Sequence, residues 1–224
     1  MEYAFKAASL GSNTAIAVRG QTSSVVITQK KVPDRLVDPS CITHIYEITN
    51  KIAVLMLGLI PDIQHQVQRL RYEASKFKYD HGIDISVYGL AQRMADILQV
   101  MTQEARGRLM ACNMLMIGHD DERGAQVYKI DPAGHFFPYK ASATGKLEPD
   151  AMNFLEKHVD SFATLSEQGA IELAISAMQY ILSTDFKSSE LEIGVVSAAA
   201  PKFRLLSDAE IEERLNAITE RADN

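Results

Sequence analysis

The densest set of residues that could do chemistry is His119-Asp120-Asp121-Glu122, an imidazole beside three carboxylates. Such groups are common ligands of Zn²⁺ and other divalent cations. Contiguous ligands in a tight turn rarely converge on one ion, however, and no second histidine follows at the spacing of a helical pair. We therefore interpret Asp120 to Gly124 as a solvated acidic turn, and we expect neither a metal nor another cofactor.

The cysteine count and the net charge bound the setting of the chain. Cys41 and Cys112 have no metal-like spacing, and so few cysteines favour a reducing, cytosolic or nuclear compartment. The net charge of −6 predicts no strong attraction to nucleic acid or to anionic membranes. No apolar run reaches the ~18 residues of a membrane span, and Met1-Glu2-Tyr3 does not resemble a signal peptide. We expect neither nucleic acid nor a membrane as a partner.

Runs of β-branched and apolar residues predict strands that would position these groups. The chain has 224 residues, 46% of them hydrophobic, which suits one domain over residues 1–224 with a sizeable core. Turn residues such as Gly20 and Asn50 separate the runs. The predicted strands are Thr14–Arg19, Val25–Lys30, Ile42–Ile48, Ile52–Leu59, Met114–Ile117, Ala125–Ile130, Phe136–Tyr139, Glu192–Ser197 and Phe203–Leu206.

Helical periodicity predicts the elements between the strands. A short helix over Glu2–Leu10 is closed by Gly11. Asp62 is expected as the N-cap of a helix that stops near Gly82, and Ser86 as the N-cap of the next helix. Later helices are expected from Asp150 to His158, from Ser166 to Leu182, and over residues 208–224 after the capping box Ser207-x-x-Glu210.

The order of strands and helix pairs predicts an α+β fold. Strands precede a helix pair, and this alternation continues to the last helix. We expect a four-layer αββα sandwich, in which two antiparallel sheets lie between two layers of helices. Sheets covered on both faces need apolar residues on both faces, which agrees with Val25-Val26-Ile27 and with the run from Ile52 to Leu57.

Four short strings point to a known family. They are Glu2-Tyr3-Ala4, Arg71-Tyr72-Glu73-Ala74, Met101-Thr102-Gln103 and Asp131-Pro132-Ala133-Gly134. Further strings follow in matching order: Gln29-Lys30-Lys31-Val32-Pro33-Asp34, Gln126-Val127-Tyr128-Lys129, Asp185-Phe186-Lys187 with Glu190, and Pro201-Lys202-Phe203-Arg204. Together they resemble the α-type subunits of the 20S proteasome, and most of all the iota type.

The resemblance implies the N-terminal-nucleophile hydrolase fold and a non-catalytic role in protein degradation. Such subunits form a hetero-heptameric outer ring that gates substrate entry and docks activators for ATP- and ubiquitin-dependent degradation. The implied partners are neighbouring α subunits, the β-ring subunits that hold the threonine proteases, and activator particles that insert C-terminal tails. The implied location is the cytoplasm and the nucleus.

The chain also departs from the family pattern. Family members carry a tail and most of a first helix before Glu2-Tyr3-Ala4, so we expect residues 1–10 to form a truncated N-terminal helix. Leu109 follows Arg108 where the family usually has proline, and Met101 replaces a common tyrosine. These positions are expected near subunit contacts.

A nucleophile can be sought at one position. In this fold, peptidase activity needs an N-terminal Thr, Ser or Cys whose own amino group acts as the base. Ser12 after Gly11 is the candidate, and autolysis between them would make the chain an autonomous hydrolase. Where active subunits have an aspartate and a lysine, however, this chain has Gln29 and His44 or its neighbours. We therefore expect no catalytic residue, and we interpret Ser12 as the start of a strand.

By resemblance, two surfaces carry the function. Tyr3 matches a tyrosine of the open gate, although it could also be an ordinary aromatic on a helix face. Gly11, His44 and Leu59 match the pocket that receives activator tails, where many family members have lysine instead of His44. Histidine is mostly neutral at pH 7, so we expect weak tail binding that strengthens at mildly acidic pH. A strand histidine with local partners is the alternative.

Overall fold

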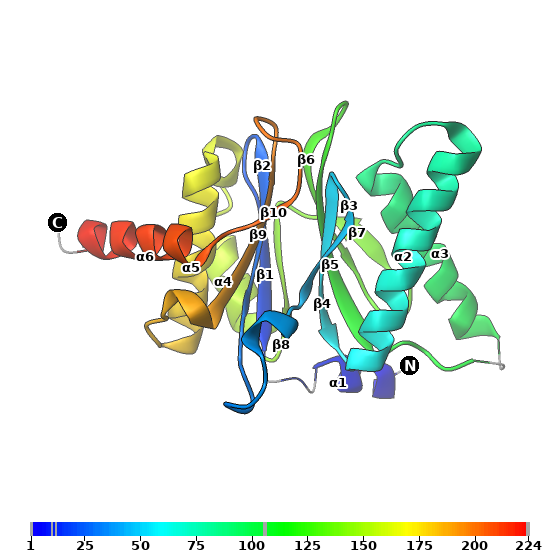
Figure 1. Cartoon of the computed structure of the whole chain (residues 1–224), viewed down its shortest axis with the longest axis horizontal. Helices are drawn as coiled ribbons and strands as arrows, with labels where there is room; N and C mark the ends of the chain where they lie inside the picture. Colours follow the sequence, from blue (N-terminus) through cyan, green and yellow to red (C-terminus); the bar gives the residue numbers. More distant parts are fainter. Residues whose placement is uncertain (1, 10, 12, 105–106, 223–224) are drawn as a thin grey trace.

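A computed structural model describes residues 2–9, 11, 13–104 and 107–222, and it contains two five-stranded antiparallel sheets that face each other (Figure 1). The first sheet has the order β10-β9-β2-β1-β8 and the second the order β3-β4-β5-β6-β7. The strands of the first sheet are β1 (Thr14–Arg19), β2 (Ser23–Gln29), β8 (Ala141–Gly145), β9 (Leu191–Ser197) and β10 (Arg204–Leu205). Those of the second are β3 (Ile45–Thr49), β4 (Ile52–Gly58), β5 (Cys112–Asp120), β6 (Gly124–Ile130) and β7 (Phe136–Pro138).

Helices cover the outer face of each sheet. On the second sheet lie α2 (Ile60–His81) and α3 (Val87–Gln103), and on the first lie α4 (Glu148–Glu156) and α5 (Glu167–Leu182), with α6 (Asp208–Ala222) against α5 (Figure 1). The helix α1 (Glu2–Ser9) lies across one end of the sandwich. Short 3₁₀ turns are η1 (Pro39–Cys41), η2 (Phe162–Thr164) and η3 (Ser188–Glu190). The predicted α+β, four-layer sandwich is confirmed.

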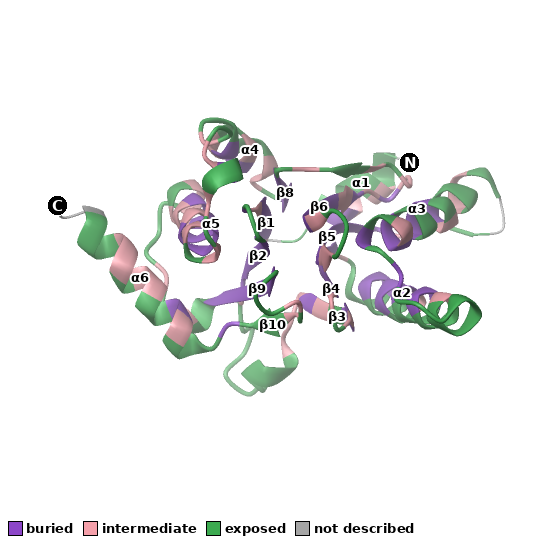
Figure 2. Ribbon diagram, turned by 90° about the horizontal axis from the view of Figure 1, so that it is seen from above, coloured by how far each residue is buried: buried purple, intermediate pink, exposed green. Residues whose placement is uncertain are grey.

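The core consists of three apolar layers, which follow from the alternation of side chains along each strand (Figure 2). In β1, Ile16 faces the helices whereas Ala15 and Ala17 face the other sheet. In β4, Met56 faces α2 and α3, and Leu55 faces the first sheet. Because both faces are covered, the middle of each of these strands is apolar on both faces, as the sequence indicated.

The predicted caps at Ser86 and Ser207 are confirmed, and Ser166, the predicted start of a helix, also proves to be an N-cap. The Oγ atoms of Ser86 and Ser166 each accept a hydrogen bond from the backbone N–H three residues later, at 3.0 and 3.2 Å. In the capping box, the N–H of Ser207 donates to Oε2 of Glu210 at 2.8 Å, and the N–H of Glu210 donates to Oγ of Ser207 at 3.4 Å. These contacts satisfy backbone donors that helix ends otherwise leave free.

The prediction of Asp62 as an N-cap is wrong. The helix α2 begins at Ile60, and Leu59 occupies the N-cap position without a side-chain hydrogen bond. Pro61 favours this earlier start, because its fixed φ suits the first turn of a helix and it has no N–H to satisfy. Asp62 is therefore inside the first turn, where it is 3% exposed and contacts Arg108.

Several other helices and strands differ from the predicted ones in their existence or in the residue at which they begin. No strand was expected at β8, whose small and polar residues have little strand propensity, yet it pairs with β1 from Thr14↔Gly145 to Val18↔Ala141. The strand expected from Ile42 begins at Ile45, after the turn η1, and the helix expected from Asp150 begins at Glu148. The predicted end of the first helix at Leu10 lies outside the described residues.

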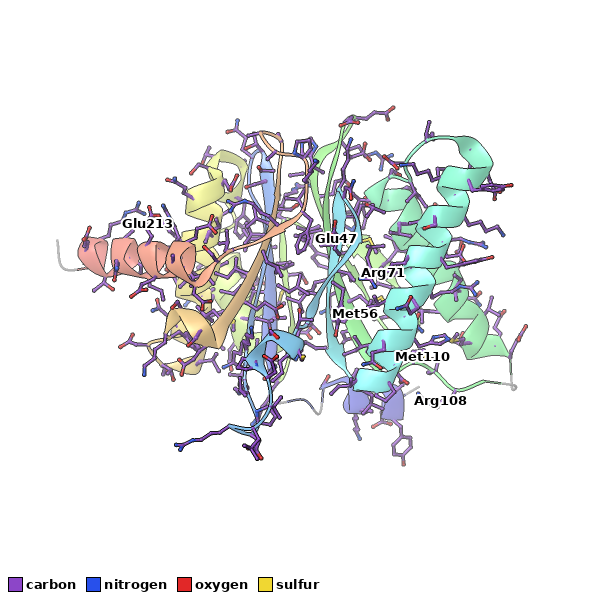
Figure 3. The ribbon with its side chains drawn as sticks, viewed as in Figure 1. Glu47, Met56, Arg71, Arg108, Met110 and Glu213 are labelled. Atoms are coloured by element: carbon purple, nitrogen blue, oxygen red, sulfur yellow. The ribbon has the colours of Figure 1, made fainter. Side chains whose placement is uncertain are left out.

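Polar contacts also hold the layers together. The guanidinium of Arg71 on α2 donates from Nε and Nη2 to the carbonyl of Glu47 on β3, at 3.1 and 2.9 Å (Figure 3).

Within the described residues, no helix has both the length and the apolar content that crossing a bilayer requires.

Candidate functional site

Each of the three predicted pocket residues lies just outside a strand or helix. Gly11 lies between α1 and β1, His44 directly precedes β3, and Leu59 follows β4. The carbonyl of His44 accepts a hydrogen bond from the N–H of Met56 at 2.9 Å, and Leu59 donates its N–H to the carbonyl of Ala111 at 3.0 Å. Gly11 is exposed, Leu59 is 44% exposed, and the side chain of His44 is 23% exposed.

Asn13 joins the start of β1 to the histidine. Its amide Nδ2 lies 3.3 Å from Nε2 of His44 and donates to the carbonyl of Gln29 at 3.3 Å. The structure therefore brings His44 and Gln29 next to the residue two positions after Gly11. In the described part of the chain, Leu59 makes no hydrogen bond to either His44 or Asn13, so it is connected to them only through β4.

A buried carboxylate lies on the other side of the histidine. Oε2 of Glu192, on β9, accepts the N–H of His44 at 2.9 Å and lies 3.9 Å from its Nδ1, while Oε1 accepts the hydroxyl of Thr43. The side chain of Glu192 is 8% exposed, and this burial raises its pKa despite the hydrogen bonds from Thr43 and His44. Nδ1 of the imidazole therefore faces a carboxylate, and Nε2 faces the amide of Asn13.

Burial also determines the protonation state of the imidazole. Loss of hydration lowers the pKa of His44 below its ordinary value of 6.5. At pH 7 the ring is therefore neutral and offers a neutral hydrogen bond, worth about 0.5–1.5 kcal/mol, instead of a charge-assisted one. Asn13 and Glu192 are local partners of His44, which agrees with the alternative interpretation of a strand histidine held by its neighbours. The side chain is nevertheless 23% exposed.

Gln29 is the residue that, by the resemblance, we expect where active subunits have an aspartate. It ends β2 and is 5% exposed, and its side-chain Oε1 is buried without a hydrogen-bond partner among the described residues. An amide has no basic site with which to assist a nucleophile at neutral pH. The candidate nucleophile Ser12 lies outside the described residues, so its role stays a prediction.

Tyr3 lies apart from these residues. It is on α1 and is 87% exposed, whereas Ala8 is the buried contact of the same helix. Its side chain is therefore exposed to solvent and does not pack against the sandwich. In the described residues, no aromatic contact or hydrogen bond links Tyr3 to His44.

An ion pair that the sequence did not predict supports the beginning of α2. Arg108 donates from Nη1 and Nη2 to the two carboxylate oxygens of Asp62, at 2.6 and 2.5 Å, and the N–H of Ala111 donates to Oδ2 at 2.8 Å. The guanidinium holds the pKa of Asp62 below its usual value. This contact fixes the segment 108–111 against Leu59. The sequence held one signal for this ion pair: Asp62 lies beside apolar residues of a helix, and a carboxylate buried there needs a cationic partner.

The acidic turn makes local contacts. Asp121 pairs with Lys51 at 3.0 Å, and Oδ1 of Asp120 accepts the N–H of Glu122 at 3.2 Å. Across the described ranges, no group of three or more His, Cys, Asp or Glu side chains is arranged to hold a metal ion. The expectation that no metal binds here stays a prediction.

Comparison with known proteins gives a consistent result. Residues 9–196 match the family model described as proteasome subunit. The chain is 39% identical over 221 residues to the Caenorhabditis elegans protein named proteasome subunit alpha type-6, a match covering 99% of this chain and 90% of that protein. It is 43% identical over 222 residues to a probable proteasome subunit alpha type-1 of Schizosaccharomyces pombe, covering 99% and 91%. A Trypanosoma brucei brucei proteasome subunit alpha type-1 is 37% identical over 225 residues, covering 97% and 84%.

Proposed function

Because the chain belongs to the proteasome subunit family, we propose that it is an α-type subunit of the outer ring of the 20S core particle. The observation that carries this proposal is the identity of 39–43% to α-type subunits over 99% of the chain. In this role residues 1–224 act as one domain that forms the ring, gates substrate entry and docks activators. The complex is a hetero-oligomer with other proteasome subunits, placed in the cytoplasm and the nucleus.

The native mass of the complex that holds this chain, purified from its own cells, tests the proposal. We expect a particle of several hundred kilodaltons that contains several related subunits of similar size. A monomer, a dimer or a ring of this chain alone would contradict the proposal. Imaging of a tagged chain tests the location, with signal expected in both compartments.

We infer that the chain has no nucleophile of its own. Gln29 and His44 supply neither the carboxylate nor the lysine that a nucleophile at position 12 would need, and His44 is already contacted by Asn13 and Glu192. The intact mass of the purified chain should therefore show no cleavage between Gly11 and Ser12. A shortened chain that begins at Ser12 would instead support an autonomous hydrolase.

We propose that the groove between α2 and α3 receives a β-ring subunit. A hollow of about 530 Å³ lies there, and it is lined in part by Val100 and Met101, of which Val100 is 44% exposed. Gln66 also lines it and is fully buried, yet neither atom of its amide has a partner among the described residues. An inserted chain could satisfy this amide. Val100→Arg should therefore reduce joining of the two rings at least severalfold, as measured by native electrophoresis, whereas Lys157→Arg should have no effect.

We also propose that Gly11, His44 and Leu59 receive the C-terminal tails of activators and that Tyr3 takes part in the gate. The support for this proposal is that Gly11 and Leu59 are exposed and that the side chain of His44 is 23% exposed. His44→Lys should bind a tail peptide about tenfold more tightly at pH 7, because a charged partner adds about 1.4 kcal/mol or more. In the unsubstituted particle, affinity should rise as the pH falls below 6.5 toward the lowered pKa of His44.

The matched control is His81→Lys, a histidine at the far end of α2. Titrations of the assembled particle with a tail peptide, followed by fluorescence anisotropy from pH 5 to 8, measure both effects. An affinity that does not change over this range, or an equal gain from His81→Lys, would contradict a role for His44.

Tyr3→Ala should lower activator-stimulated peptide hydrolysis, and an unchanged rate would exclude Tyr3 from the gate.

A further inference from the structure

Three cationic residues line a hollow at the end of the sandwich away from α1. The hollow has a volume of about 310 Å³ and is lined by Arg19 at the end of β1, Arg123 in the β5–β6 hairpin, and Lys140 just before β8. The hairpin and the β1–β2 turn project from the end of the sandwich opposite α1 (Figure 1). Among the residues that the structure describes, no acidic one lines the hollow.

Two of these cations are held beside each other by the sheet. Val18 pairs with Ala141, and at the next step of the ladder the N–H of Arg19 donates to the carbonyl of Lys140 at 2.8 Å. Like charges directly opposite each other on antiparallel strands destabilise a sheet. The fold therefore maintains a repulsion here that a bound anion would relieve.

The repulsion is not relieved within the described chain. Neither Arg19, Arg123 nor Lys140 forms an ion pair with a carboxylate in the ranges that the structure describes. The acidic residues Asp120 and Asp121 line a separate hollow beside Lys51, and Asp121 pairs with that lysine. In a chain of net charge −6, this is a local excess of positive charge.

One of the cations is already engaged by the protein. The guanidinium of Arg123 lies 5.0 Å from the centre of the Tyr88 ring on α3, which is a cation–π arrangement. Tyr88 is not among the described residues that line the hollow, so Arg123 adds positive charge at its rim, while Arg19 and Lys140 are the direct donors. Phe162 and Ala163 form an apolar wall of the same hollow.

We propose that this hollow binds a small soluble anion that carries two linked phosphate groups. Arginine matches phosphate with paired N–H donors, and lysine supplies a compact charge. Three cationic centres from three separate segments exceed what one carboxylate can neutralise, and the volume suits a compact ligand. The site is independent of the gate and of the tail pocket, because it is at the opposite end of the sandwich.

The test is a titration with inorganic pyrophosphate. The full-length chain is used in the complex in which it is purified from its own cells, in phosphate-free buffer, and calorimetry measures binding. Lys140→Gln and Arg19→Gln should each weaken the binding attributable to this chain about tenfold, and affinity should fall as salt rises. Arg19→Lys keeps the charge and should stay within about threefold of the original affinity. Lys157→Gln, a surface lysine on the α4 side, is the matched control and should change nothing.

The proposal is overturned by any of three results. These are the absence of a saturable site that Lys140→Gln weakens, an equal loss from Lys157→Gln, and sulfate binding as tightly as pyrophosphate. Thermal unfolding provides a second readout. Pyrophosphate should raise the unfolding temperature of the original complex more than that of the Arg19→Gln complex, because a ligand stabilises the state that binds it. Equal shifts in the two complexes would also overturn it.

Discussion

The two ends of the sandwich differ in whether their charged side chains have partners within the described chain. At the α1 end, Asp62 is held by Arg108, and Glu192 accepts hydrogen bonds from Thr43 and His44. At the other end, Arg19 and Lys140 lie beside each other without a carboxylate partner in the described chain. Paired buried charges fix segments in place, whereas unpaired exposed charges leave free energy available for a ligand. The first end is therefore held together by contacts within the chain, and the second is the end at which we propose a binding site.

A pair of glycines tests the rigidity of the two ends, with the largest expected effect. Gly58 has φ of +146°, and an added Cβ would lie 2.1 Å from the carbonyl oxygen of Ala111. Gly58→Ala should thus lower the free energy of unfolding by more than about 3 kcal/mol. Gly124, in the hairpin, has φ of +69° and nothing within 4 Å of an added Cβ, so Gly124→Ala should cost only about 1 kcal/mol. Urea denaturation of the purified chains measures both, and similar losses would refute the contrast.

A pair of arginines tests the charges themselves. Arg108→Ala leaves Asp62 buried without its bidentate partner, and should lower the free energy of unfolding by about 2–3 kcal/mol. This is below the usual cost of breaking a buried pair, because the Arg108 side chain is 64% exposed and water can partly replace it. Arg123→Ala should cost no more than about 1 kcal/mol, since Arg123 has no carboxylate partner in the described chain and loses its cation–π contact with Tyr88. A greater loss from Arg123→Ala would reverse our interpretation of the two ends.

The same ion pair predicts a dependence on pH. Arg108 lowers the pKa of Asp62 in the folded state, so its contribution to stability is complete above the ordinary value of 3.8. It is lost as the pH falls through the lowered pKa. In Arg108→Ala this acid-sensitive component should be absent, which urea denaturation at pH 3 and pH 6 would detect. An unchanged difference between the two pH values would contradict the assignment.

The smallest effect is expected at Glu192. Burial raises its pKa, so the folded state binds more protons than the unfolded state above the ordinary value of 4.5. The contribution of Glu192 to stability therefore falls as the pH rises from 4.5 through the raised pKa. Glu192→Gln should remove this slope while changing stability at pH 7 by no more than about 1 kcal/mol. Glu212→Gln on α6 is the control, and a slope that persists in Glu192→Gln would place its origin elsewhere.

The sequence by itself determined the features that depend on near neighbours in the chain. A run of β-branched and small residues predicted β1 with its observed ends, and Ser86, Ser166 and the Ser207 box predicted where helices begin. The strings shared with a known family led to the prediction that Gly11 and His44 are pocket residues. Residue spacing alone could not have led to it. Such signals are readable because strand alternation and helix capping act over a few residues.

Tertiary structure alone decided the contacts between distant segments. Asp62 and Arg108 are 46 residues apart, Glu192 and His44 are 148 apart, and β8 is a strand because β1 pairs with it. The meeting of Arg19, Arg123 and Lys140 likewise depends on the packing of two sheets. No local pattern encodes these pairings, since an ion pair requires proximity in space and not a particular spacing in sequence. The partners of each charged side chain, and therefore its role, became visible only when the sheets were assembled.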